Sequence, residues 1–209
     1  MAELVQRVSD VARGAALMTG TTVSIKMLSA VSNLLHNETL ATVMSHEMER
    51  LGPPVFDEAD HAFAREIQKT LTAGDISDTY RRFGLEPVDG LPGMSTILVP
   101  RSSPRIPLMG STDLGDVSWV VPLVQLQAAT CAIGTPFHSW QLTAQGKSPG
   151  AKKGMAYAAL AMASAAVRLF EDPAIIEQAK DELVRRTARN PYASPLPVDA
   201  VPPVKEMAL

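Results

Sequence analysis

The feature that most limits how this chain can fold is a strand-like segment, residues 21–35, between two helical segments near the start of the sequence. Residues 3–17 carry apolar side chains at helical spacing, and Thr19-Gly20 ends that pattern. Residues 21–35 are rich in threonine, serine and β-branched side chains with partial alternation, which favours a half-buried strand. A lone strand cannot satisfy its backbone groups. We therefore expect its partner strands before Met1 or in another chain.

A second helix follows this segment and ends at the clearest boundary in the sequence. Asn37 can cap the helix, whose inner face runs to Leu51, and Gly52-Pro53-Pro54 then stops it. This punctuation predicts one domain over residues 1–52 and a second over 53–209.

The rest of the chain predicts an α/β fold. A third helix starts near Asp57, and a loop-rich stretch then runs to about residue 95. The apolar segments that follow predict short strands over residues 94–99, 106–109 and 117–126. The remaining expectations are a small-residue helix over 154–170, a polar helix from Pro173 to about Thr187, and an extended, proline-rich tail over 190–203.

Composition excludes several classes of function. The chain has 209 residues, 46% of them hydrophobic, and a net charge of −3 without a basic stripe, so we expect no nucleic-acid binding. Its longest apolar run, residues 117–133, contains Pro122 and is too short to span a bilayer, so we expect no membrane segment. The start of the chain lacks a secretory signal, and Cys131 has no second cysteine to pair with. These features predict a cytoplasmic protein.

Two segments carry residues that could bind a metal ion. Asp113 and Asp116 lie in the first, and His138 lies in the second, between Gly134 and Gln141. Carboxylates and a loop histidine can form one wall of a metal site, but a catalytic zinc ion needs three protein ligands. The alternative is that His138 and Trp140 order a surface loop, while the two aspartates make turn contacts with nearby amides. Spacing alone favours this alternative.

These two segments resemble the C-terminal half of amidohydrolases in the zinc peptidase family that includes aminoacylase and carboxypeptidase G. The matching stretches are Gly-Ser-Thr-Asp-Leu-Gly-Asp-Val-Ser-Trp from Gly110 and Gly-Thr-Pro-Phe-His-Ser-Trp-Gln from Gly134. The resemblance extends over nearly the whole chain, and the further matching segments are residues 14–22, 51–54, 144–148 and 190–197.

The resemblance implies a two-domain enzyme. In the family, an α/β catalytic domain with a zinc pair is interrupted by a smaller α+β lid that mediates dimerisation. Residues 1–52 would be the second half of the lid, and residues 53–209 the closing part of the catalytic domain.

The resemblance also implies roles for individual residues. His138 would be the last metal ligand, and Asp113 and Asp116 would line the substrate pocket. His36 and Asn37 would reach the substrate from the lid. For those two residues a turn and a helix cap are an equal alternative.

The chain departs from the family in ways that bear on activity. Phe137 stands where relatives carry glycine, and Lys152 stands where they carry histidine. The resemblance places the other metal ligands and the catalytic glutamate in the N-terminal half of the family's enzymes, outside the segments matched here.

Three hypotheses of function follow. The first is a truncated amidohydrolase, inactive alone, for N-acyl or aminobenzoyl amino acids such as aminobenzoyl-glutamate. Zinc or another divalent metal would serve the complete enzyme and would not be held tightly by this chain. The second is a non-catalytic interaction module, and the third is the C-terminal half of a split enzyme. The expected partners are a second copy, a related subunit or the missing N-terminal half, together with a small-molecule substrate.

Overall fold

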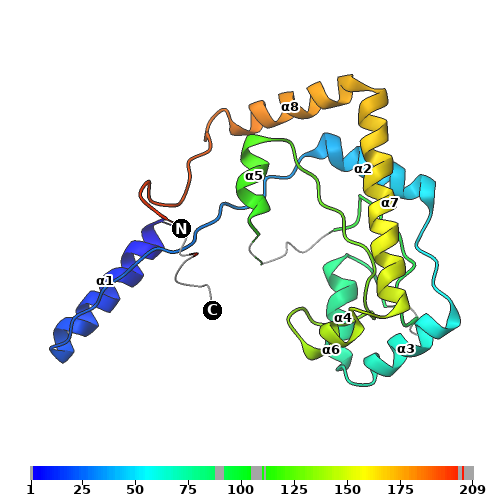
Figure 1. The fold of residues 1–209 in the computed structure, drawn as a ribbon, viewed down its shortest axis with the longest axis horizontal. Coiled ribbons are helices and arrows are strands. Elements are labelled where there is room, and N and C mark those ends of the chain that lie inside the picture. Colours follow the sequence, from blue (N-terminus) through cyan, green and yellow to red (C-terminus); the bar gives the residue numbers. More distant parts are fainter. Residues whose placement is uncertain (1, 88–91, 105–109, 111, 202–203, 205–209) are drawn as a thin grey trace. The chain divides into compact units, whose positions relative to one another are not determined.

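The computed structural model describes residues 2–87, 92–104, 110, 112–201 and 204. These residues form helices joined by irregular segments, and none of them forms a strand (Figure 1). The helices are α1 (Ala2–Thr19), α2 (Glu38–Leu51), α3 (Glu58–Gln68), α4 (Ala73–Arg82), α5 (Leu114–Val120), α6 (Trp140–Gln145), α7 (Pro149–Glu171) and α8 (Pro173–Thr187).

The expected strands are wrong wherever the structure describes them, so the α/β class is not confirmed. Residues 21–35 and 94–99 are irregular, and residues 106–109 lie outside the described part. The segment expected as a strand over 117–126 begins inside α5 and continues without regular structure. The physical reason is that a β-strand is stable only beside another strand, and the described residues offer no such partner.

The helices with strong local start and stop signals are confirmed. The side chain of Asn37 accepts a hydrogen bond from Leu40 N at the start of α2, and Gly52 ends that helix with a φ of 74°. Asp57 and Asp60 form a reciprocal capping box at the start of α3. These contacts satisfy backbone groups that a helix end leaves unpaired.

Three shorter helices, α4, α5 and α6, were not predicted. Thr72 and Asp75 form a capping box that starts α4 inside the stretch expected as loop. The threonine and aspartate three residues apart were a usable sign of a helix start. Ser139 caps α6 through its side chain, where the sequence indicated only a loop.

The described residues divide into two compact units. Unit 1 contains residues 1–35, 111–121 and 186–209, and unit 2 contains residues 36–110 and 122–185. Helix α2 therefore lies in the same unit as α7, against which it packs. The predicted domain boundary at residue 52 stays a prediction.

The core of unit 2 consists of two small clusters of buried residues. One cluster joins α3 to three irregular segments, and the other joins α2 to α7. Their buried members are Phe56, Ala64, Ile67, Met94 and Ala132 in the first, and Val43, Met44, Ala161 and Ala165 in the second.

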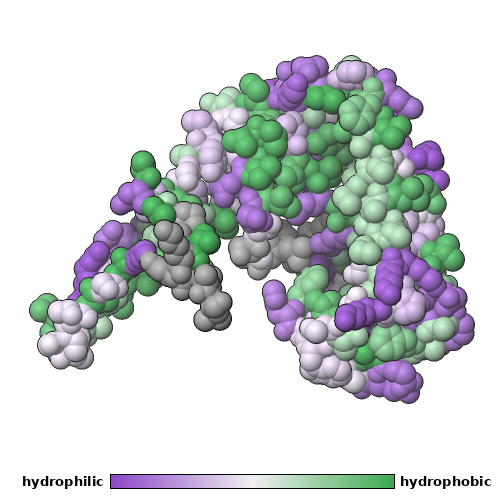
Figure 2. Space-filling view, viewed as in Figure 1, coloured by the Kyte–Doolittle hydropathy of each residue, from purple (hydrophilic) through white to green (hydrophobic). Residues whose placement is uncertain are grey.

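Helix α7 uses small residues for close packing. A Cβ atom on Gly154 would lie 2.0 Å from the carbonyl oxygen of Ala129, so only glycine permits this approach. The opposite side of α7 stays exposed and contributes to the hydrophobic surface in Figure 2; its large apolar residues are Met155, Leu160, Met162, Val167 and Phe170. Among the described residues, no helix has the length and apolar character to cross a membrane.

Candidate functional site

His138 lies in an exposed loop of unit 2, directly before α6. Its φ of 59° is the only positive φ of a non-glycine residue in the described chain. Histidine tolerates this left-handed region better than most residues, but a positive φ is still uncommon and costs energy. A strained residue that persists on the surface is held there by its surroundings.

Gln145 makes three of the hydrogen bonds that hold this loop. The side chain is buried, with 2% of the residue exposed. Its Oε1 accepts a hydrogen bond from Ala132 N at 2.7 Å, and its Nε2 donates to Thr135 Oγ1 and to Gln141 O, both at 3.0 Å. One side chain therefore links the segment before His138 to the helix after it.

A second glutamine acts on the same segment from α3. Gln68 is also buried, and its Nε2 donates to the carbonyl oxygen of Ile133 at 3.2 Å. The next residue, Gly134, has a φ of 94°, and a Cβ there would lie 2.7 Å from Ile76 Cγ1 on α4. The segment that leads to His138 is thus packed against α3 and α4.

The side chains beside His138 are open to solvent. Phe137 is 58% exposed and Trp140 is 62% exposed. The guanidinium carbon of Arg82 lies 5.7 Å from the centre of the Phe137 ring, a distance that allows a cation–π contact. The loop therefore presents an imidazole flanked by aromatic surface.

The described residues do not complete a metal site around His138. No group of three or more histidine, cysteine, aspartate or glutamate residues among them could hold a metal ion. Zinc needs at least three protein ligands in a catalytic site, and this loop offers one. A catalytic zinc site at His138 would need at least two further protein ligands.

Asp113 and Asp116 lie in unit 1, at the start of α5. Asp113 is exposed and its side chain makes no capping hydrogen bond. Asp116 Oδ1 accepts hydrogen bonds from Ser32 N at 3.2 Å and from Tyr192 OH at 3.1 Å. The hydrogen bonding from Ser32, with a smaller part from Tyr192, lowers the pKa of the Asp116 carboxyl below its ordinary value of 3.8.

The contact between Asp116 and Ser32 belongs to a larger attachment of α5 to residues 32–35. Leu35 N donates to Ser118 Oγ at 2.7 Å, and the indole nitrogen of Trp119 donates to Asn33 O at 2.9 Å. A Cβ on Gly115 would lie 1.9 Å from the carbonyl oxygen of Ser32. Asp116 therefore holds a segment distant in sequence, where the sequence suggested either a pocket wall or a local turn contact.

Asn37 and His36 occupy structural positions in unit 2. Asn37 is 3% exposed, and besides capping α2 it donates from Nδ2 to Ala179 O on α8 at 3.0 Å. His36 Nε2 lies 3.3 Å from Glu38 Oε1. These contacts match the helix-cap alternative for Asn37, while a substrate-binding role for the two residues stays a prediction.

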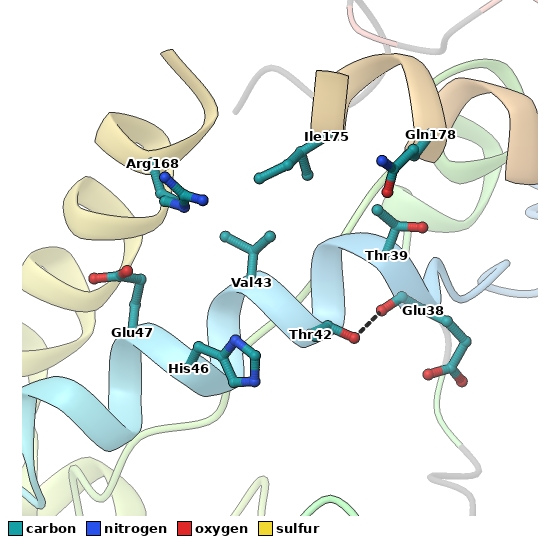
Figure 3. Close-up of a pocket in the computed structure, with 9 residues that line it drawn as sticks. All are labelled: Glu38, Thr39, Thr42, Val43, His46, Glu47, Arg168, Ile175 and Gln178. Atoms are coloured by element: carbon teal, nitrogen blue, oxygen red, sulfur yellow. Dashed lines mark hydrogen bonds between the residues drawn. The ribbon is translucent and has the colours of Figure 1, made fainter. Parts of the chain in front are cut away.

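A groove of about 510 Å³ lies between α2, α7 and α8, and the sequence did not predict it. Val43 on α2 and Ile175 on α8 point toward each other across it, and Arg168 and Glu47 lie at one end (Figure 3). Both of these charged groups have partners, because Arg168 lies 3.4 Å from Asp172 and Glu47 lies 2.7 Å from Arg50. The other lining residues are Glu38, Thr39, Thr42, His46 and Gln178.

Comparison with known proteins finds similarity to a hydrolase subunit. No family model and no solved structure matches the chain. The chain is 37% identical over 205 residues to one of the subunits of p-aminobenzoyl-glutamate hydrolase from Escherichia coli (strain K12). The match covers 94% of this chain and 43% of the E. coli protein. Over nearly its whole length the chain is therefore similar to a p-aminobenzoyl-glutamate hydrolase subunit, as its motifs predicted, and it spans less than half of that protein.

Proposed function

We propose that this chain is part of an amidohydrolase that cleaves the amide bond of p-aminobenzoyl-glutamate or a related N-acyl amino acid. His138 supplies one ligand to a zinc or other divalent metal site, and the remaining ligands come from outside this chain. Alone, the chain is inactive and binds the metal weakly.

The observation that carries this proposal is the left-handed φ of His138, within a motif that resembles the zinc peptidase family. The loop is braced by the buried Gln145 and exposes the imidazole to solvent. Such bracing lowers the entropy cost of binding a metal ion, because the backbone that carries the imidazole is already ordered. The similarity to a protein named as a p-aminobenzoyl-glutamate hydrolase subunit supports the proposed substrate class.

The need for a partner follows from the donors that unit 2 offers near this loop. His138 is the one candidate ligand that the motif supplies, and the described residues bring no cluster of further donors to it. A metal site bound through one imidazole is weak, since affinity rises with the number of ligands that a protein fixes in place. A related subunit or a separate N-terminal half would supply the others.

The test is an assay of p-aminobenzoate release from p-aminobenzoyl-glutamate, together with the zinc content of the same samples. The full chain is measured alone and as the complex isolated with its natural partner. We expect no activity and zinc near zero for the chain alone, and activity in the complex. The H138A variant should lower that activity more than about 100-fold, beyond the loss typical of a residue that only contacts a ligand.

The matched control is H46A, which removes an exposed histidine from α2. It should leave the activity of the complex unchanged. One or two tightly held zinc ions in the isolated chain would contradict the proposal, because a complete site would then exist within it. Full activity of the H138A complex would show that His138 is no ligand.

A second candidate function is that of a non-catalytic interaction module. The observation that favours it concerns α1. None of its residues is buried, and it exposes the apolar side chains of Leu4, Val8 and Val11. Such a helix gains stability by packing against another surface. A complex that forms but never hydrolyses the substrate would support this second function over the first.

A further inference from the structure

Two buried glutamines enclose the segment that leads to His138. Gln145 reaches it from α6 and contacts Ala132 N and Thr135 Oγ1, while Gln68 reaches it from α3 and contacts Ile133 O. A carboxamide both donates and accepts hydrogen bonds, so it can satisfy backbone groups of both kinds. Here Gln145 uses its oxygen and its nitrogen on groups that lie on either side of the loop.

The geometry of the loop demands such a restraint. A residue with a Cβ atom is disfavoured in the left-handed region, so an unrestrained loop would move His138 to a negative φ. The side chain of His138 does not supply the restraint, because it is exposed. The hydrogen bonds that Gln145 makes to residues 132, 135 and 141 limit where the backbone of the intervening loop can run.

We propose that Gln145 is a positioning residue that, with Gln68, holds the His138 loop in the conformation that presents its imidazole. This inference rests on the proposed function for its purpose, while the conformational role of Gln145 is independent of it. Gln145 bonds Ala132, Thr135 and Gln141, so it acts on His138 through the loop that joins these residues.

The test uses nuclear magnetic resonance of the full chain without metal, with the His138 amide and Cα resonances as the readout. In Q145L an apolar side chain of similar size leaves Ala132 N and Thr135 Oγ1 without their partner. We expect the His138 resonances to shift toward those of a residue with negative φ. The matched control is Q178L, the same change at an exposed glutamine of α8, and it should leave them unchanged.

A second variant, Q145E, tests whether restoring the hydrogen-bond donor restores the loop conformation. A change in overall stability alone would not produce this recovery. Glutamate in Q145E accepts hydrogen bonds at any pH, but it donates only when protonated. Residue 145 lines a small pocket together with Asp57 and Asp60, whose carboxylates pair with Lys153. Burial raises the pKa of such a glutamate. Compared with the wild type at the same pH, the His138 resonances of Q145E should therefore be displaced at neutral pH. In mild acid they should return toward the wild-type positions.

The outcomes separate this inference from the proposed function. Displaced His138 resonances in Q145L, with recovery of Q145E in acid, support the positioning role even if the chain never hydrolyses an amide. Wild-type His138 resonances in either variant at neutral pH would overturn it, even if the variant unfolds at a lower denaturant concentration. If Q145L does not fold, the pH response of Q145E decides, and a displacement that does not change with pH would also overturn the inference.

Discussion

His138 combines an exposed side chain with a backbone conformation that proteins usually reserve for glycine. A left-handed conformation costs an L-residue roughly 1–2 kcal/mol, although histidine is among the more tolerant types. The chain retains this cost at a position where the exposed imidazole gains little from packing. Strain of this kind gathers at functional sites, which agrees with the role proposed for His138.

The strain predicts an unusual order of stability among substitutions at this position. Glycine removes the free-energy cost of the positive φ, and this gain is larger than the loss caused by the greater entropy that glycine gives the unfolded chain. H138G should therefore be more stable than H138A by roughly 0.5–1 kcal/mol. Urea unfolding of both variants measures the difference. The same pair at Lys147, which is exposed and lacks a positive φ, should show the opposite order. An equal or lower stability of H138G would contradict the left-handed assignment.

Asn37 has a structural role at a position where the resemblance predicts a substrate contact. A polar residue in the lid segment is a reasonable substrate contact, but both hydrogen-bonding groups of its amide are used within the protein. A buried polar group that gives up such bonds loses stability. For Asn37 to bind a substrate, α2 would first have to lose its cap.

At the scale of elements, an ion-pair cluster joins α7 to the start of α3. Lys153 Nζ lies 2.7 Å from Asp57 Oδ2 and also bonds the buried Asp60, whose side chain is 2% exposed. The hydrogen bond from Lys153 is the main cause that lowers the pKa of Asp57 below 3.8. The hydrogen bond to Asp57 is likewise the main cause that raises the pKa of Lys153 above 10.5.

The directions of these pKa shifts set the pH range in which the cluster stabilises the protein. The contribution of Asp57 is complete above pH 3.8 and is lost as the pH falls through its lower folded-state pKa. The contribution of Lys153 is complete below pH 10.5 and is lost as the pH rises through its higher folded-state pKa. Both contributions are therefore present between these two values.

Removing one partner of this cluster should cost more than removing two. K153M leaves the buried carboxylate of Asp60 without its cation, so the urea midpoint should fall at neutral pH. Adding D60N to K153M should recover part of that loss, because a neutral amide needs no counter-ion. A double variant less stable than K153M would contradict this explanation. The K147M variant, which makes the same change at an exposed lysine, is the control.

The attachment of α5 to residues 32–35 depends on close approach at Gly115. G115A places a Cβ against the carbonyl oxygen of Ser32, so the segment should move away from α5 and the indole of Trp119 should lose its bond to Asn33. A shift of the Trp119 indole NH resonance measures this change. G110A, where a Cβ meets no atom of the described residues within 4 Å, should leave the resonance in place. An unshifted signal in G115A would contradict the attachment.

At the scale of the whole molecule, the chain corresponds to less than half of the hydrolase subunit that it resembles. Helix α1 has 18 residues and none of them is buried. Even its apolar residues Val8 and Val11 are 68% and 73% exposed. Isolated helices of this length are marginal in water without packing. This apolar surface is suited to association with another polypeptide.

The exposed face of α1 predicts how the chain associates. V8K/V11K should weaken association of the full chain with itself or with its partner, since two charges are expensive to bury in an apolar contact. Sedimentation velocity over a range of concentrations measures the change. V55K, a lysine at a single exposed valine outside the helices, is the control. Association that is unchanged in V8K/V11K would remove α1 from the interface.

The helices α1, α2, α3, α7 and α8 could be predicted from the sequence because their signals are local. Asn37 and Asp57 form caps with residues three positions away, and the apolar periodicity acts within a few turns. The resemblance around His138 was also readable, because it rests on contiguous motifs and needs no knowledge of packing. The sequence by itself therefore determined these five helices and the similarity to a hydrolase subunit.

Only the tertiary structure decided whether residues 21–35 form a strand and which residues surround His138. A β-branched segment becomes a strand only beside a partner, and no local pattern reveals whether that partner is present. The left-handed φ of His138 depends on Gln145 and Gln68, and Asp116 is engaged by Ser32, which is 84 residues away in sequence. These features arise from contacts between distant residues, and a single sequence does not record which distant residues meet.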